Sequence, residues 1–306
     1  MTKVNQKTLK DKIRFSGIGL HSGLNVNLTI KPSEPDSGII FKRLDIQDHN
    51  IIHANFKNVV EPILCTKIKN ESGITVSTVE HLMAAFYGEG VDNAQVEVDA
   101  PEIPILDGSA VDFVDAIKLV GTEEQNKPRQ FIKVLKKVEV KDGEKYISIE
   151  PLNQDLIIDF EIIFNNPLIR TRRKEFKFSK DNLTDIYNSR TFCLYEEIDN
   201  IKRKGLAKGG SLENAVVVKG NQILNEDGLR NRHEFVYHKI LDCLGDIMLS
   251  GNRIFGHIIT SQGGHALTNK LLVKFFSDKA NWSLENFENI EKQNKNSYKN
   301  PLAISI

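Results

Sequence analysis

The chain has 306 residues, of which 40% are hydrophobic and 27% charged, values typical of a globular protein of two domains or one large one. Its 41 basic and 41 acidic side chains cancel. The overall charge therefore gives no electrostatic reason for binding to nucleic acid or for broad adhesion to an anionic membrane.

The first half of the chain alternates strand and helix patterns. The segment Ser77-Thr78-Val79-Glu80 fits the S-x-x-E capping box, which predicts a helix that starts at Ser77 and ends at Gly88 and Gly90. A second helix is expected over Ala110–Val120. The expected strands are Ile13–Phe15, Asn25–Ile30, residues 38–43, Ile74–Val76 and Asn93–Val98.

A polar stretch between Gly121 and Arg129, closed by Pro128, is the best domain boundary. We expect a first domain over residues 1–124 and a second over residues 130–280. Residues from about 281 to 306 are rich in Asn, Lys and Glu and are expected to form a loosely ordered polar tail.

The second half shows the same alternation. We expect strands over residues 131–140, 146–150, 156–164 and 253–261, and helices near residues 181–187, 234–249 and 266–276. Both halves thus predict an α+β protein of two two-layer sandwich domains with similar architecture, each a sheet packed with helices.

The helix around residue 240 carries an unusual polar stripe. At about 100° per residue, positions four apart return to within about 40° of each other, so His238, Asp242 and Asp246 share one face. A solvated surface stripe is the alternative, but the flanking residues have the character of a core. Zinc accepts His nitrogen and carboxylate oxygen, and ligands at i and i+4 suit it, so we favour a metal site.

Two further signals are weaker. Glu80-His81 places a possible general base beside a possible ligand, although locally the capping role for Glu80 is the simpler interpretation. Gly263-Gly264-His265 presents a histidine at a strand-to-helix turn, which an ordinary loop would do equally well.

Several strings resemble one family in their order and spacing over nearly the whole chain up to about residue 280. They are residues 17–23 (GIGLHSG), 77–82 (STVEHL), 105–109 (ILDGS), 189–192 (SRTF), 225–230 (NEDGLR), 238–246 (HKILDCLGD) and 264–267 (GHAL). They are similar to the UDP-3-O-acyl-N-acetylglucosamine deacetylases, the zinc enzymes that commit acylated UDP-sugar to lipid A biosynthesis in Gram-negative bacteria.

The resemblance implies one Zn²⁺ ion per chain, located between the two domains. The implied metal ligands are His81, His238 and Asp242. The implied catalytic groups are Glu80 as general base, His265 as general acid, Asp246 as the partner that orients that imidazole, and Thr191 as a hydroxyl for the oxyanion. The implied substrate contacts are Lys239 with phosphate, Phe192 with sugar, and Leu20 and His21 near the acyl and sugar positions.

The resemblance also makes residues of about 193–220 an insert that forms a passage for the fatty chain. Gln262 departs from the basic residue expected there for a phosphate contact, and Ala207 stands where some relatives have Cys.

Two alternative functions are a zinc amidase with another substrate and a non-catalytic nucleotide-sugar sensor. The amidase would have no use for the passage, and the sensor would not need Glu80, Asp246 and His265. A His2Asp site fits iron as well as zinc in principle.

Other features concern the setting of the protein. The N-terminus lacks an apolar signal core, and no run of about 18 apolar residues occurs, so we expect no membrane span. Cys65, Cys193 and Cys243 are odd in number and far apart, which favours free thiols and a cytoplasmic protein. We expect a monomer whose partner is its small-molecule substrate, the acylated UDP-N-acetylglucosamine.

Overall fold

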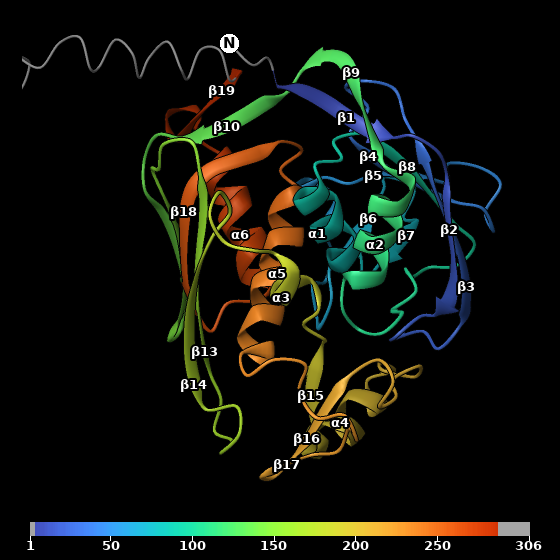
Figure 1. Cartoon of the computed structure of the whole chain (residues 1–306), viewed down its shortest axis with the longest axis vertical. Helices are drawn as coiled ribbons and strands as arrows, with labels where there is room; N and C mark the ends of the chain where they lie inside the picture. The colour runs from blue at the N-terminus through green and yellow to red at the C-terminus, as the bar shows by residue number, and fades with distance from the viewer. Residues whose placement is uncertain (1–3, 287–306) are drawn as a thin grey trace, which may run out of the picture.

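The computed structural model describes residues 4–286 as an α+β fold, which confirms the predicted class. Two larger β-sheets stand on opposite sides of a central group of helices (Figure 1). The helices between the sheets are α1 (Glu80–Glu89), α2 (Val111–Val120), α5 (Glu234–Met248) and α6 (His265–Phe276). None of the helices in the described part of the chain is long and apolar enough to cross a membrane.

The first sheet comes from the N-terminal half and has five strands. Its order is β2 (Ile13–Ile18), β3 (Asn25–Pro32), β8 (Ala94–Val98), β4 (Ile39–Arg43) and β5 (Ile51–His53). Val26, Leu28 and Ile30 alternate along β3 and are all buried, as the period of two predicts. One face of this sheet therefore supplies core against the helices.

The second sheet has seven strands. They are β10 (Gln130–Val134), β11 (Val138–Asp142), β12 (Lys145–Glu150), β13 (Leu156–Ile163), β14 (Thr171–Lys177), β18 (Arg253–Ser261) and β19 (Trp282–Asn286). β18 is central: it pairs with β10 and β13 in parallel and with β12 in antiparallel fashion. Helices α5 and α6 pack on one face of this sheet.

Three small sheets and several short helices make up the rest of the regular structure in residues 4–286. The small sheets are β1 (Asn5–Leu9) with β9 (Thr122–Pro128), β6 (Lys67–Lys69) with β7 (Thr75–Ser77), and β15 (Phe192–Leu194) with β16 (Val216–Lys219) and β17 (Gln222–Ile223). The short helices are η1 (Phe56–Asn58), α3 (Thr184–Tyr187), η2 (Tyr195–Glu197), α4 (Ile198–Arg203) and η3 (Lys279–Asn281).

Helices α1 and α5 approach each other very closely at Gly245. A Cβ atom added there would lie 2.0 Å from the backbone oxygen of Glu80. Only glycine permits this approach, because any side chain would overlap the first turn of α1. The contact brings the residue pair Glu80-His81 against the middle of α5.

The structure differs from the expected elements at several points. The polar stretch taken as a linker contains β9, which pairs with β1, and residues 131–140 form two strands instead of one. Trp282–Asn286, expected within the polar tail, pairs as β19 with β10; the rest of that predicted tail, residues 287–306, lies outside the described residues. The division into two domains stays a prediction.

The predicted capping box does not form. Helix α1 begins at Glu80, its N-cap is Val79, and no side chain caps it. Ser77 lies instead at the end of β7, where its hydroxyl donates to the carbonyl of Pro101. Glu80 is thereby left without the local role that its sequence context suggested.

Candidate active site

Three potential metal ligands meet where α1 packs on α5. One ligand atom from each of His81, His238 and Asp242 lies within 4.8 Å of the others, and all three residues are buried. The Oδ1 atom of Asp242 lies 3.4 Å from Nε2 of His238 and 3.6 Å from Nε2 of His81. Two nitrogens and one oxygen that converge in this way are a donor set suited to zinc or a similar divalent metal.

The surroundings prepare these groups for a cation. The Nδ1 atom of His238 lies 3.0 Å from the backbone oxygen of Ser189, which fixes Nδ1 as the protonated nitrogen and leaves the Nε2 lone pair facing Asp242. Burial lowers the pKa of His238 to about 3, so its ring is neutral at pH 7. Burial alone would raise the pKa of Asp242, but His238 and Lys239 hold it well below its usual range. The residues therefore fit a bound metal.

Glu80 lies beside these ligands as the first residue of α1. It is buried, and its Oε2 atom accepts a hydrogen bond of 2.9 Å from the backbone N–H of Thr66. Burial raises the pKa of its carboxyl group, while His265 and His81 oppose that shift. A carboxylate whose pKa is raised toward neutrality is suited to accept a proton.

His265 and Asp246 form a second titratable pair. His265 is the first residue of α6, and its Nδ1 atom lies 2.9 Å from Oδ2 of Asp246 on α5. Burial lowers the pKa of His265, but Asp246 overrides this and raises it to about 9. Its Nε2 atom lies 4.0 Å from Oδ2 of Asp242. A protonated imidazole thus stands next to the ligand cluster.

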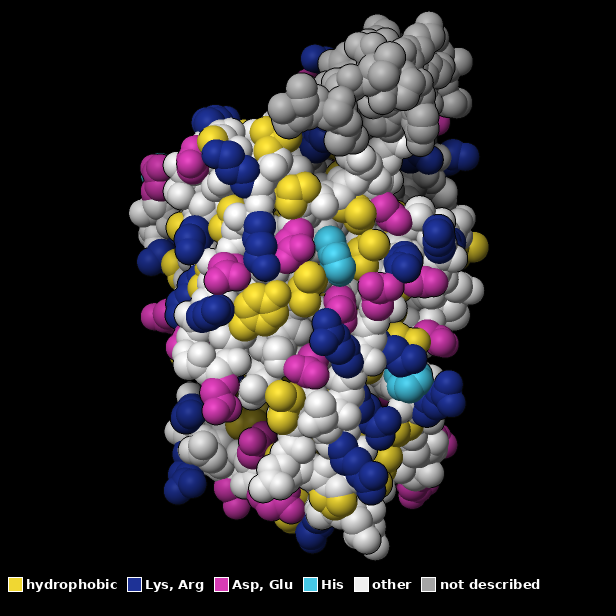
Figure 2. Space-filling model, turned by 90° about the vertical axis from the view of Figure 1, so that its left-hand side faces the viewer, with side chains coloured by type: hydrophobic (Ala, Val, Ile, Leu, Met, Phe, Trp, Pro, Cys, Tyr) yellow, Lys and Arg dark blue, Asp and Glu magenta, His cyan; other side chains and the backbone are white. Residues whose placement is uncertain are grey.

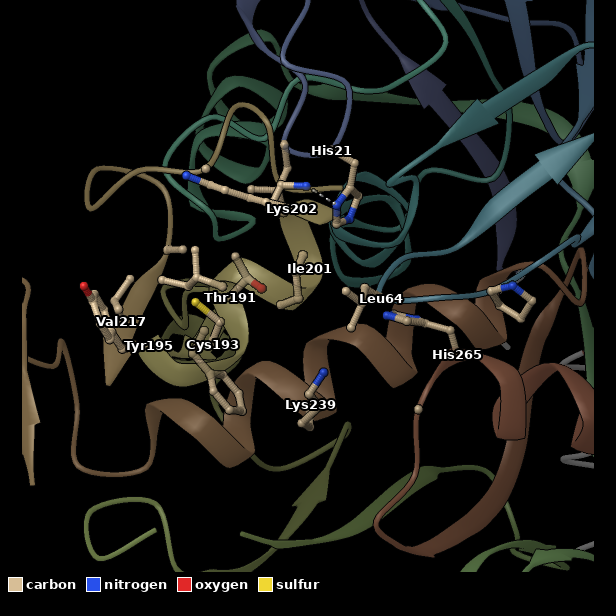
Figure 3. A pocket seen from close by; sticks show the side chains of 18 of the residues that line it. His21, Leu64, Thr191, Cys193, Tyr195, Ile201, Lys202, Val217, Lys239 and His265 are labelled. Atoms are coloured by element: carbon tan, nitrogen blue, oxygen red, sulfur yellow. Dashed lines mark hydrogen bonds between the residues drawn. The ribbon is translucent and has the colours of Figure 1, made fainter. Parts of the chain in front are cut away.

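A cavity of about 650 Å³ opens beside the ligand cluster (Figure 3). Six of the predicted site residues line it: Leu20, His21, Thr191, Phe192, Lys239 and His265. The other five predicted residues are not among the lining residues and lie on α1 and α5, which pack against each other: His81, His238, Asp242, Glu80 and Asp246. The structure thus brings the predicted residues into one region.

One arm of the cavity is apolar. Most of the residues that line it belong to the insert expected at about residues 193–220, which includes α4 and most of β15 and β16. These elements lie at the bottom of the molecule in Figure 1. Its lining includes Cys193, Tyr195, Ile198, Ile201, Ala207, Leu212, Ala215, Val217 and Leu224. Such a surface suits a hydrocarbon chain.

Lys239 and His21 are held at opposite sides of the cavity, as Figure 3 shows. The Nζ atom of Lys239 donates to Oδ2 of Asp242 at 2.8 Å and lies over the ring of Phe192 at 5.7 Å. The backbone N–H of His21 donates to the buried carboxylate of Glu102, which anchors its turn.

Three residues that support the site were assigned no role from the sequence. They are Thr66 beside Glu80, Ser189 behind His238, and Glu102 under the turn that carries His21. The bond from Thr66 to Glu80 and the bond from His238 to Ser189 use backbone groups of Thr66 and Ser189, which are the same for every residue type, so no pattern of side chains could have indicated those two bonds.

A second cluster of potential ligands lies far from this site, on the outer face of the larger sheet. It consists of Asp159, Glu175 and His257. Both carboxylate oxygens of Asp159 already accept hydrogen bonds from Arg173, at 2.8 and 2.6 Å, so this cluster is occupied by a cation of the chain itself. Figure 2 shows this side of the molecule as a mixture of both charges with scattered hydrophobic residues.

Comparison with known proteins gives a consistent result. The model of one family, UDP-3-O-acyl N-acetylglycosamine deacetylase, matches residues 6–277. A protein of Teredinibacter turnerae named UDP-3-O-acyl-N-acetylglucosamine deacetylase is 44% identical over 291 residues, which cover 94% of this chain and 95% of that protein. Proteins with the same name from Vibrio campbellii and Pseudoalteromonas atlantica are 42% and 39% identical; each alignment covers 94% of this chain, and 95% and 96% of those proteins.

Proposed function

Because this chain belongs to the UDP-3-O-acyl N-acetylglycosamine deacetylase family, we propose that it hydrolyses the N-acetyl group of UDP-3-O-acyl-N-acetylglucosamine. The products are UDP-3-O-acyl-glucosamine and acetate, and the reaction commits the sugar to lipid A biosynthesis. The observation that carries the proposal is the convergence of His81, His238 and Asp242 beside a buried carboxylate and a cationic imidazole.

The three ligands would hold one zinc ion. When bound, zinc supplies a Lewis acid that polarises the amide carbonyl and lowers the pKa of a coordinated water toward about 7. The same donor set also accommodates iron. The geometry therefore supports a divalent metal, and the choice of zinc over iron is our proposal.

The protein's own residues would move the protons. Glu80 accepts a proton from the attacking water, and the hydroxyl of Thr191 donates to the oxygen that becomes negative as the carbonyl is attacked. His265 gives the proton on Nε2 to the amide nitrogen, because the C–N bond breaks easily only when the amine leaves protonated. The charge of Asp246 keeps His265 protonated until that step.

The cavity supports the choice of substrate. Its apolar arm under α4 would take the 3-O-acyl chain, with Leu20 and His21 near its entrance, and Phe192 and Lys239 would contact the sugar and the phosphates. Gln262 lines the same cavity without a charge, so phosphate binding would rely on lysine side chains, and Lys145 is also among the lining residues.

The test measures bound metal and acetate release from the acylated UDP-sugar in three variants. Glu80→Gln should keep the metal and lower kcat by roughly two to four powers of ten, the usual range for an acid–base group. His238→Ala should lose both metal and activity. Glu175→Gln, on the outer face of the larger sheet, is the control and should change neither.

Several results would contradict this proposal. They are a protein without metal, Glu80→Gln at full activity, or equal turnover of an N-acetyl sugar that lacks UDP and the acyl chain. Reconstitution of the metal-free protein with Zn²⁺ or Fe²⁺ separately identifies the metal that supports turnover.

We also propose that the protein works as a monomer in the cytoplasm. Cys65, Cys193 and Cys243 are free thiols, which supports a reducing compartment. Sedimentation of the purified protein at working concentration tests the monomer.

A further inference from the structure

Thr66 occupies an unusual position next to the proposed catalytic groups. It directly precedes β6, and the hairpin of β6 and β7 pairs Lys67 with Ser77, immediately before the chain enters α1. This pairing holds Thr66 beside the first turn of α1, where the backbone N–H of Val79 lies 3.4 Å from the oxygen of Thr66. The residue is only 1% exposed and does not line the cavity.

Thr66 contacts both halves of the proposed acid–base machinery. Its backbone N–H donates to Oε2 of Glu80 at 2.9 Å. Its hydroxyl lies 2.5 Å from Oδ1 of Asp246 and 3.1 Å from Nδ1 of His265. Thr66 thus contacts three site residues on three helices: Glu80 on α1, Asp246 on α5 and His265 on α6.

The direction of these hydrogen bonds follows from the number of protons. A hydroxyl has one hydrogen to donate, and the short distance assigns it to the acceptor-only carboxylate of Asp246. A lone pair of the same oxygen then faces Nδ1 of His265, so the N–H at Nδ1 is shared between Thr66 Oγ1 and Asp246 Oδ2. With the Nδ1 proton held by two acceptors, Nε2 is the nitrogen that exchanges its proton.

We propose that Thr66 is a positioning residue for the hydrolysis: its hydroxyl fixes the Asp246–His265 pair while its backbone N–H fixes Glu80. This inference rests on the proposed roles of those three residues. It assigns Thr66 no contact with substrate or metal, so its loss should slow the chemical step and leave binding of both unchanged.

The test compares Thr66→Val, Thr66→Ala and Thr66→Ser. Val keeps the shape and the backbone N–H but removes the hydroxyl, and should lower kcat about ten- to hundredfold with KM and zinc content unchanged. Ala should behave like Val, and Ser, which keeps the hydroxyl, should recover most of the rate. Thr8→Val is the matched control, because Thr8 is equally buried and its hydroxyl makes two hydrogen bonds within the first half of the chain, away from the site.

A double-mutant cycle shows whether Thr66 acts through Asp246. In an Asp246→Asn background, Thr66→Val should cost much less than in the parent, because the partner of the hydroxyl is already altered. Additive effects would contradict the inference.

Other results would also overturn it. They are a Thr66→Val enzyme within about twofold of the parent rate, a Ser variant as slow as Val, a loss explained by raised KM or missing zinc, or failure of both Val and Ala to fold. If Glu80→Gln is inactive while Thr66→Val is fully active, only this inference fails. If Glu80→Gln is itself fully active, the proposed mechanism fails first.

Discussion

Gly245→Ala is the sharpest test of how the fold builds the site. The added methyl group would lie 2.0 Å from the backbone oxygen of Glu80, whereas ordinary contact begins at 3.4 Å. Helices α1 and α5 would therefore have to separate locally by more than about 1 Å. His81 follows Glu80 in α1, so it would move away from His238 and Asp242. Metal sites tolerate changes of only about 0.2 Å in their bond lengths, so this movement would weaken metal binding.

Two effects on stability oppose each other in this variant. Alanine favours a helix over glycine by about 0.5–1 kcal/mol, and overpacking costs about 1–3 kcal/mol, so the free energy of unfolding should change little or fall moderately. Function should suffer far more: a displacement of about 1 Å costs on the order of a hundredfold in kcat, together with weaker metal binding.

The assay combines a chelator competition for the metal with acetate release and urea denaturation. Gly88→Ala is the matched control, because its methyl group would meet the side chain of Tyr187, at the far end of α1 from the ligands. It should lower stability and leave metal affinity unchanged. Parental metal affinity and kcat in Gly245→Ala would refute the reasoning.

The remaining predictions concern charge, burial and the cavity. Because Asp246 raises the pKa of His265 above its ordinary value, activity that needs protonated His265 should fall on an alkaline limb of kcat/KM, and Asp246→Asn should move this limb to lower pH; an unmoved limb would contradict the assignment. In the metal-free protein, the stability from this raised pKa should be complete below pH 6.5 and lost through about pH 9, as pH-dependent unfolding would show. Arg190→Met leaves the fully buried Glu234 carboxylate without its ion pair, so the free energy of unfolding measured in urea should fall by about 3–5 kcal/mol. A decrease of less than about 1 kcal/mol would contradict this prediction. Ala215→Phe should fill the apolar arm and raise KM about tenfold or more for a long-chain substrate but not for a short-chain one, and equal effects on both would reject this use of the arm.

The helix spacing of the sequence predicts the placement of His238 and Asp242, but not that of His81. The apolar flanks and regular spacing around His238 and Asp242 indicated one face of a helix, and α5 places them so. No spacing rule connects His81 to them, because the contact of α1 with α5 arises only from tertiary packing at Gly245. The resemblance to a family, and not the helix period, pointed to His81 as the third proposed ligand.

Local rules were misleading where the partner lies elsewhere in the chain. The sequence around Glu80 fits a capping pattern, yet its carboxylate accepts a hydrogen bond from the backbone N–H of Thr66, the residue before β6. The strands β9 and β19 were not predicted, for different reasons. β9 is polar along its whole length and mostly exposed, so it shows no alternation. β19 does alternate, with Trp282 and Leu284 on one face and Ser283 and Glu285 on the other, but it is only five residues long and opens a segment whose Asn, Lys and Glu content indicated a tail.

The central position of β18 affects the order in which the protein can assemble during synthesis. β12 and β13 are neighbours in the chain but each pairs with β18. The hairpins β11–β12 and β13–β14 therefore leave the ribosome with open edges, about 75 to 100 residues before the strand that joins them. The larger sheet closes only when residues 253–261 emerge, so the edges of β12 and β13 stay without their final partner while about a third of the chain is made, and during that time they are open to pairing with another copy.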